Sequence, residues 1–218
     1  MRRAASEIAT GTLFGIALNY QGLLESRLQE FNEPPYQKPP QKPVLFIKTP
    51  NTRSTDGQAV SAPAGERLQP GPALGVVIGK TASRVDEKNA FAHVAGYVVV
   101  NEFSLPEDSY YRPAVKAKCR DGFCAFGNDV IPTGEIADVH ALVIKLLVNG
   151  EVRQENTTAN FVRSIPRLIS ELSEFMTLHE GDVLITGTPE GRVDVLPGDE
   201  VVVEISGLGR LTNHIVAE

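Results

Sequence analysis

Few side chains in this sequence have the type and spacing that metal or nucleophilic chemistry needs. The two cysteines, Cys119 and Cys124, are separated by four residues and flank Asp121-Gly122. No second cysteine pair completes a zinc site, and no histidine is near enough in sequence to serve as a base for a thiolate. We therefore expect two reduced thiols with a structural role. The four histidines are interpreted as surface or strand residues: His93, His140, His179 and His214.

The elements that must position any site are mostly strands. A tight hairpin is predicted at Asn149-Gly150, because a type I′ turn needs positive φ at both central residues, and Val152 starts the return strand. Short apolar runs, several of them rich in β-branched residues, predict strands over Thr12–Tyr20, Val44–Lys48, Ala73–Lys80, Tyr97–Phe103, Ala141–Val148, Asp182–Thr186 and Glu200–Ile205.

Helical patterns are fewer. Leu23–Phe31 is amphipathic and long enough for about two turns. A short helix is predicted over Asp86–His93, with the aspartate as its cap. The longest helix is predicted over Ser164–Met176, where apolar side chains recur on one stripe, the serine can cap and a proline lies in the first turn.

A proline-rich segment separates the first helix from the next strand. Glu33–Pro43 holds five prolines in eleven residues, which removes backbone donors and favours extended geometry. Three interpretations remain open for it: a packed surface loop, a mobile lid or a docking motif.

Together these patterns predict a mainly β fold with a few helices, of the α+β class. We expect a single domain over residues 1–218, in which residues 1–70 supply an N-terminal strand, a helix and the proline-rich loop, and residues 71–218 supply the core.

The charge and hydropathy of the chain exclude two classes of partner. A formal net charge of −6 provides no basic field for nucleic acid phosphates or anionic lipid. The first apolar stretch, Thr12–Leu18, is too short to span a membrane and lacks a clean cleavage site. We therefore expect a cytoplasmic protein with neither a nucleic acid nor a membrane partner.

From about Gly71 to Val216 the order of segments resembles that of the fumarylacetoacetate hydrolase family. The motifs that carry this resemblance are GVVIGKTASRV, VAGYVVVNEFS, YRPAVKAKCRDGFCAFG, the long block from NGEVRQ to TGTPEG, and LPGDEVVVEISGLGRLTN. The N-terminal GIALNYQ also fits the family's first strand. The resemblance implies a distorted β-roll of the kind found in this family.

Within the family, the run YRPAVKAKCRDGFC, the proline-rich segment and the short chain are most similar to one branch. It is the N-terminal half, or first subunit, of the isomerase/decarboxylases of 4-hydroxyphenylacetate (homoprotocatechuate) catabolism. This similarity implies decarboxylation of 5-oxopent-3-ene-1,2,5-tricarboxylate and isomerisation of 2-hydroxyhepta-2,4-diene-1,7-dioate. It also implies a small dicarboxylic or tricarboxylic 2-oxo acid as ligand, and a homo-oligomer or a hetero-oligomer with a homologous second subunit.

Both reactions pass through an enolate, which a hard divalent cation such as Mg²⁺ or Mn²⁺ can stabilise. In the family an E-x-E pair, whose side chains share one face of a strand, binds this cation with a downstream aspartate. In this sequence the pair falls on Gly71 and Ala73, and the aspartate falls on Glu102. Glu102 is thus the remaining candidate metal ligand, or a polar residue that ends a strand. Glu66 or Glu107 could replace a lost ligand.

The family's hydrolases also carry a histidine and a glutamate that activate the attacking water. Here these positions fall on Leu23 and Ser26, neither of which is a base at neutral pH. Their replacement argues against C–C bond hydrolysis, whereas decarboxylation needs no nucleophilic water.

Two substrate-facing family positions are retained. Lys118 matches the lysine that faces the substrate, where its ammonium could balance a carboxylate or enolate, whereas Lys116 could equally be a solvated residue. Thr188 matches the threonine that meets the substrate carboxylate, and Gly187 allows close approach of the backbone. A plain loop turn is the alternative for this segment.

Two further candidates flank the predicted site. Arg112, next but one to Tyr110, could grip a second carboxylate with its guanidinium fork. Asn101 either contacts the ligand or satisfies backbone groups. Two functions therefore stay open: a lyase/isomerase that works through a metal-stabilised enolate, and a non-catalytic subunit that pairs with a metal-competent homologous chain.

Overall fold

The computed structural model describes residues 2–107 and 109–218, which form two sheets with few helices. The nine-stranded sheet has the order β1-β9-β7-β6-β12-β2-β3, with β8 paired to β7 and β4 paired to β8. Its strands are β1 (Arg3–Ala4), β2 (Leu13–Ala17), β3 (Val44–Lys48), β4 (Arg53–Thr55), β6 (Pro72–Ile78), β7 (Val94–Glu102), β8 (Cys124–Phe126), β9 (Asp129–Pro132) and β12 (Val183–Ile185).

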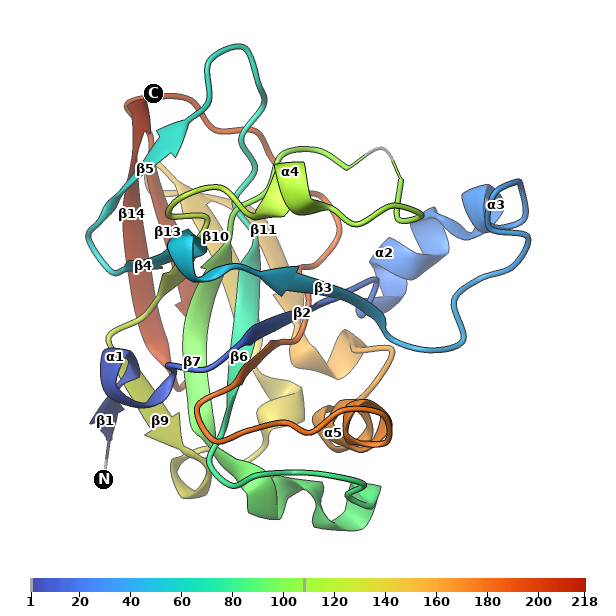
Figure 1. Cartoon of the computed structure of the whole chain (residues 1–218). Helices are drawn as coiled ribbons and strands as arrows, with labels where there is room; N and C mark the ends of the chain where they lie inside the picture. The colour runs from blue at the N-terminus through green and yellow to red at the C-terminus, as the bar shows by residue number, and fades with distance from the viewer. Residues whose placement is uncertain (1, 108) are drawn as a thin grey trace.

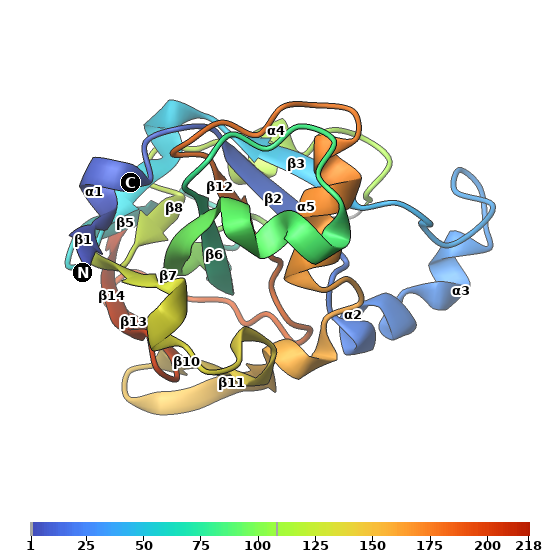
Figure 2. The same cartoon turned by 90° about the horizontal axis from the view of Figure 1, so that it is seen from below.

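The second sheet has five strands in the order β11-β10-β13-β14-β5. They are β5 (Ala59–Ala62), β10 (Val143–Val148), β11 (Glu151–Thr157), β13 (Glu200–Ile205) and β14 (Gly209–Ala217). The α-helices are α1 (Ala5–Ile8), α2 (Gln21–Ser26), α3 (Leu28–Phe31), α4 (Val115–Lys118) and α5 (Ile165–Ser173). Short 3₁₀ segments are η1 (Pro50–Thr52), η2 (Glu87–His93), η3 (Thr133–Glu135), η4 (Val139–Ala141) and η5 (Thr158–Asn160). Figures 1 and 2 show α2, α3 and α5 on the side of the molecule away from β14.

The strand predictions are largely confirmed. β3 and β13 have the predicted bounds. β2 ends before Tyr20, because Leu18 has a positive φ of 59° and breaks the extended chain. The predicted hairpin turn joins β10 to β11, and both of its central residues have positive φ, 52° at Asn149 and 81° at Gly150.

Two helix predictions need correction. The segment Leu23–Phe31 is interrupted at Arg27, which ends α2 and precedes α3. The helix predicted over Asp86–His93 is present as the 3₁₀ helix η2, but the predicted cap is wrong, since the Asp86 side chain makes no capping bond. Ala90 is the only buried residue of η2, so this segment has no apolar stripe to stabilise α-helical geometry.

The longest helix, α5, forms within its predicted range. The Ser164 side chain caps it by accepting the backbone N–H of Arg167. The helix ends before Phe175 and Met176, and Phe175 is exposed. The predicted apolar stripe therefore extends past the end of the helix, where Phe175 lies on the surface of the molecule.

The core explains how the sheets position the ends of β6 and β7. On β6, alternate side chains point to opposite faces, so Leu74, Val76 and Ile78 enter the larger core with α5 and the five-stranded sheet. Ala73 and Val77 enter a smaller apolar cluster on the other face. All seven residues of β6 are buried, and the start of β6 lies beside the end of β7.

The proline-rich segment Glu33–Pro43 forms an exposed loop of turns and bends. Tyr36 attaches it to the rest of the chain, since its hydroxyl accepts the backbone N–H of Tyr110 at 2.6 Å and its ring packs edge-on against Phe31. Within the described ranges, no helix has both the length and the apolar character needed to cross a membrane.

Candidate functional site

The carboxylate of Glu102, at the end of β7, is buried and surrounded by three cationic side chains. Lys48 Nζ lies 2.8 Å from Oε1, and Lys118 Nζ lies 3.2 Å from Oε2. The guanidinium of Arg192 also contacts Oε2. Strand β3, helix α4 and the loop after β12 each contribute one cation, so the cluster joins three distant parts of the chain.

Lys48 is fully committed to internal contacts. Besides Glu102, its ammonium donates to the backbone carbonyls of Phe103 at 2.6 Å and Phe123 at 2.8 Å. An ammonium has three N–H donors, so all three are used. Burial lowers the pKa of Lys48, while the neighbouring Glu102 opposes that effect. This lysine therefore holds the ends of β7 and β8 together.

Lys118 lies between two carboxylates in the last turn of α4. Its ammonium contacts Glu102 and also Glu107, at 2.9 Å, and it donates to Ser104 Oγ at 3.2 Å. The same ammonium lies over the ring of Phe46, 4.4 Å from the centroid. The predicted catalytic lysine is thus buried within an ion-pair network.

Arg192 connects Glu102 to the loop that follows β12. Nη2 donates to Thr188 Oγ1 at 3.1 Å as well as to the Glu102 carboxylate. Nη1 donates to the carbonyls of Glu102 at 3.2 Å and Gln69 at 3.4 Å. The planar guanidinium therefore links Glu102 at the end of β7 to Thr188 in the loop after β12.

The protonation state of Glu102 follows from these contacts. Burial alone would raise its pKa, but Lys118, Lys48 and Arg192 together hold the pKa at about 2. Glu102 is consequently ionised at neutral pH, and its negative charge is compensated within the protein.

A small cavity of about 40 Å³ lies beside this cluster. Lys118, Thr188, Gly187 and Glu102 all line it, so the structure brings these four predicted residues together. Gly187 has a φ of +112°, and a Cβ there would lie 2.9 Å from the carbonyl of Ile16, so the approach of this loop to β2 requires glycine. The cavity has room for a few water molecules, which is less than a dicarboxylic acid needs.

Other predicted residues lie outside this cavity. Arg112 is exposed and lines a neighbouring groove. Asn101 is buried and serves the backbone, since its Oδ1 accepts the N–H of Gly71 at 2.9 Å. Burial raises the pKa of the Cys124 thiol to about 12, and Cys119 is also free.

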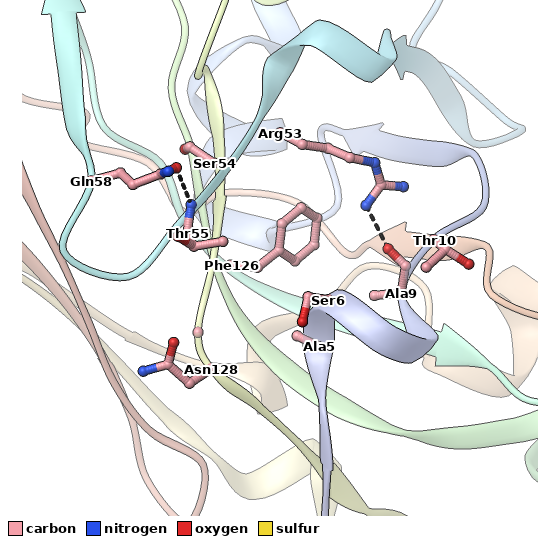
Figure 3. A pocket seen from close by; sticks show the side chains of 11 residues that line it. Ala5, Ser6, Ala9, Thr10, Arg53, Ser54, Thr55, Gln58, Phe126 and Asn128 are labelled. Carbon is pink, nitrogen blue, oxygen red and sulfur yellow. Dashed lines mark hydrogen bonds between the residues drawn. The ribbon is translucent and has the colours of Figure 1, made fainter.

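A wider cavity, of about 430 Å³, lies between α1, β4 and β8. Figure 3 shows its one charged side chain, Arg53, pointing toward the carbonyl of Ala9. The same guanidinium also donates to Gly11 and lies over the ring of Phe126. None of the cavity's lining residues within the described part of the chain is a carboxylate, histidine or cysteine, so these residues offer no group for acid–base work.

The fold and the order of these residues match a known family. Residues 12–216 match the family model described as fumarylacetoacetate (FAA) hydrolase C-terminal. The chain belongs to the fumarylacetoacetate hydrolase family. The resemblance inferred from the motifs is thereby confirmed.

Named members of the family cover most of this chain. The 4-hydroxyphenylacetate degradation bifunctional isomerase/decarboxylase of Escherichia coli is 46% identical over 95% of the chain, and that of Salmonella dublin is 44% identical over 95%. The match covers 47% and 48% of these relatives, so the chain spans about half of their length.

Solved structures of the family have the same fold. The 2-hydroxyhepta-2,4-diene-1,7-dioate isomerase of Mycobacterium marinum superposes with a TM-score of 0.82 at 26% identity, covering 97% of this chain and 76% of that one. Maleylpyruvate hydrolase of Sphingobium, in complex with manganese(II) ion and pyruvate, gives 0.78 at 27% identity, covering 94% and 70%.

The fumarylacetoacetate hydrolase positions for water activation are inert here. Leu23 of α2 forms part of the cavity wall. Ser26 is exposed and donates its hydroxyl to the carbonyl of Leu23 at 2.8 Å. No histidine among the described residues lines the cavity.

The fumarylacetoacetate hydrolase metal site does not fit this chain. A Cβ at Gly71 would lie 2.3 Å from the carbonyl of Glu102 and 2.8 Å from Arg192, so an acidic side chain has no space there. Ala73 packs in the smaller apolar cluster. Among residues 2–107 and 109–218, no group of three histidine, cysteine or acidic side chains is arranged to hold a metal. The expectation of Mg²⁺ or Mn²⁺ is therefore unsupported by the residues.

Neither Glu66 nor Glu107 is available to replace a missing metal ligand. Glu66 pairs on the surface with Lys116 at 2.8 Å. Glu107 reaches the cavity, but its carboxylate pairs with Lys118. Three cations thus compensate the one acid that remains from the family's ligands.

Two residues of the site, Lys48 and Arg192, were not predicted from the sequence. Lys48 carried a weak signal, because it is the only charged residue of the strand VLFIK. Arg192 carried none, since it follows Gly191 in an irregular loop and its position depends on contacts with β7.

Proposed function

We propose that this chain is one subunit of a two-part isomerase/decarboxylase of 4-hydroxyphenylacetate (homoprotocatechuate) catabolism. Its named relatives carry that activity and are about twice as long. In this proposal the metal-dependent steps take place in a homologous second subunit, where a divalent cation would supply the electron sink for the enolate. The subunit described here contributes the fold and the pairing surface.

The observation that carries this proposal is the ion-pair cluster around Glu102. A divalent cation needs free carboxylate oxygens, whereas both oxygens of Glu102 already contact cationic side chains. The space beside Gly71 is also filled. The site therefore offers a divalent cation neither an unpaired carboxylate nor space for a second acidic ligand beside Gly71.

The experiment compares the chain alone with a two-part protein. One protein is the purified chain, and the other is a chimera in which the chain replaces the matching half of the Escherichia coli relative. We expect the chain alone to hold no stoichiometric metal by elemental analysis and to leave 2-hydroxyhepta-2,4-diene-1,7-dioate unchanged. The chimera should isomerise it in the presence of Mg²⁺, faster than the unmatched Escherichia coli half alone. Stoichiometric metal or turnover in the lone chain would contradict the proposal.

One observation favours a second candidate, a decarboxylase that works without metal. Lys118, Arg192 and Thr188 converge on the same cavity, which must widen beyond its volume of about 40 Å³ to admit the acid. When the bond to the leaving carboxylate breaks and CO₂ departs, its electron pair moves to the 2-oxo oxygen, where fixed cations can stabilise the enolate. This candidate predicts CO₂ release by the EDTA-treated chain and loss of that activity in Lys118→Ala.

A further inference from the structure

An apolar groove of about 720 Å³ runs along β3 on the surface of the molecule. Six large apolar or aromatic side chains in the described ranges are more than half exposed, and four of them line this groove: Ile47, Tyr111, Val115 and Phe175. The other two, Val152 and Leu196, lie elsewhere on the chain. Exposed apolar side chains that gather in this way are typical of an interaction surface.

The groove is also poor in charge. Seventeen residues of the described ranges line it, and among these Glu107 and Arg112 carry a formal charge at neutral pH. The protein as a whole has 48 acidic and basic residues, 21 lysines and arginines with 27 aspartates and glutamates. Depletion of charge around exposed aromatic side chains distinguishes the centre of a protein interface from ordinary surface.

Strand β3 adds a backbone component to this surface. It is the last strand of its sheet, and no other strand of the described residues pairs with its outer edge. Ile47 is 54% exposed on that strand, and its carbonyl accepts a weak hydrogen bond from the thiol of Cys119. An open apolar edge of this kind is normally covered in the assembled protein.

We propose that this groove and the outer edge of β3 form the surface on which the second fumarylacetoacetate-hydrolase-fold half docks. This inference rests on the proposed function. The match covers 47–48% of its named relatives, so those proteins contain a further stretch of similar length, which is the second half in this proposal. At about 720 Å³ this groove is larger than two other cavities of the described residues, which measure about 430 Å³ each.

The same surface reaches the ion-pair cluster. Glu107 and Tyr110 line both the groove and the small cavity beside Glu102. Glu107 contacts Lys118 on the cavity side. A partner bound in the groove would therefore contact Glu107 and Tyr110, which also form the wall of the small cavity. Binding of the partner can thus affect the contacts around Glu102.

The test uses the chain co-expressed with the unmatched half of the Escherichia coli relative as a separate polypeptide. Ile47→Ser, Tyr111→Ser and Phe175→Ser each remove an exposed apolar side chain from the groove, and Leu196→Ser removes one of similar exposure outside it. Analytical ultracentrifugation gives the dissociation constant of each complex. We expect at least about a tenfold weakening for at least two of the groove variants and less than about twofold for the control, as for central and peripheral interface residues.

The outcomes separate the surface from the function. If the wild-type complex forms and all three groove variants bind as tightly as Leu196→Ser, the surface assignment is wrong while the proposed function stands. If the wild-type chain forms no complex, both proposals fail. If groove variants instead disrupt self-association of the chain, the occupant is a second copy and not the second half. Circular dichroism confirms that each variant is folded, and protection of residues 44–48 from hydrogen exchange in the complex would support the assignment independently of mutation.

Discussion

The guanidinium of Arg192 contacts the carboxylate of Glu102, and its Nη2 lies only 2.8 Å from the point that a Cβ of residue 71 would occupy. One side chain therefore neutralises Glu102, the predicted remaining metal ligand, and fills the space beside Gly71, where the motifs predict that a ligand was lost. Arg192 also donates hydrogen bonds to Thr188 and to the carbonyl of Gln69. Its guanidinium therefore links these residues to Glu102 within the protein, without a metal ion.

Removal of Arg192 should destabilise the protein. Arg192→Ala leaves a buried carboxylate with one fewer cation, and loss of one partner of a buried ion pair costs about 3 kcal/mol in the free energy of unfolding. Urea denaturation measures this change. Free guanidinium at millimolar concentration should partly restore the stability of Arg192→Ala and leave the wild type unchanged, because it can re-enter the vacated position.

The matched control for that experiment is Arg67→Ala. Arg67 pairs with Asp194 at 2.7 Å, but its side chain is 66% exposed, so its loss should cost much less stability than the loss of Arg192. Equal losses in the two variants, or no rescue by guanidinium, would show that Arg192 acts only as packing.

The ionisation of Glu102 predicts how stability depends on pH. Its pKa is lowered from 4.5 to about 2 in the folded protein, so it contributes stability that is fully present above about pH 4.5 and is lost as the pH falls toward 2. The contribution is about 3 kcal/mol, from 1.36 kcal/mol per unit of pKa. Urea denaturation between pH 6 and about pH 3 should show a shallower loss of stability in Glu102→Gln than in the wild type.

Lys116→Met is the matched control for this pH effect. It breaks the pair between Lys116 and Glu66, which lies on the surface, where a charge pair has little effect on stability. The pH profile of this variant should parallel that of the wild type. A Glu102→Gln profile that also parallels the wild type would mean that Glu102 is not the source of the slope.

The two sheets were predictable from the sequence to the extent that period and composition determine strands. The bounds of β3 and β13 followed from short β-branched apolar runs, and the turn at Asn149-Gly150 followed from the backbone conformation that it requires. The helix predicted from Asp86 forms over Glu87–His93 as a 3₁₀ helix, because a polar segment with one buried residue has no apolar stripe to stabilise α-helical geometry.

The candidate site was only partly predictable, for a different reason. Family motifs pointed to Glu102, Lys118 and Thr188, which the fold brings to one cavity. Lys48 and Arg192 enter that cluster through pairings between segments far apart in sequence, which no local pattern reports. The lack of space for a side chain at Gly71 also depends on such long-range contacts, with Glu102 and Arg192.

Metal ions should not stabilise this chain. A ligand that binds only the folded state raises the melting temperature once its concentration exceeds its dissociation constant, and here the one candidate acid is already compensated. We expect Mg²⁺, Mn²⁺ and EDTA each to change the melting temperature of the lone chain by less than about 1 °C. The Sphingobium hydrolase that was solved with manganese(II) is the positive control. A saturable upward shift with Mn²⁺ in the lone chain would contradict the structural argument.

Gly71 should tolerate no side chain, even a methyl group. The Cβ of Gly71→Ala would lie 2.3 Å from the carbonyl of Glu102, which is backbone and cannot rotate away, so the start of β6 and the end of β7 must separate. Overpacking of this kind costs about 2 kcal/mol in the free energy of unfolding, measured by urea denaturation. Gly134→Ala is the matched control, because a Cβ there meets no atom within 4 Å, and its stability should change by less than about 0.5 kcal/mol. If Gly71→Ala were as stable as Gly134→Ala, the space beside Arg192 would be large enough for a side chain, and the structural argument against a metal ligand at this position would fail.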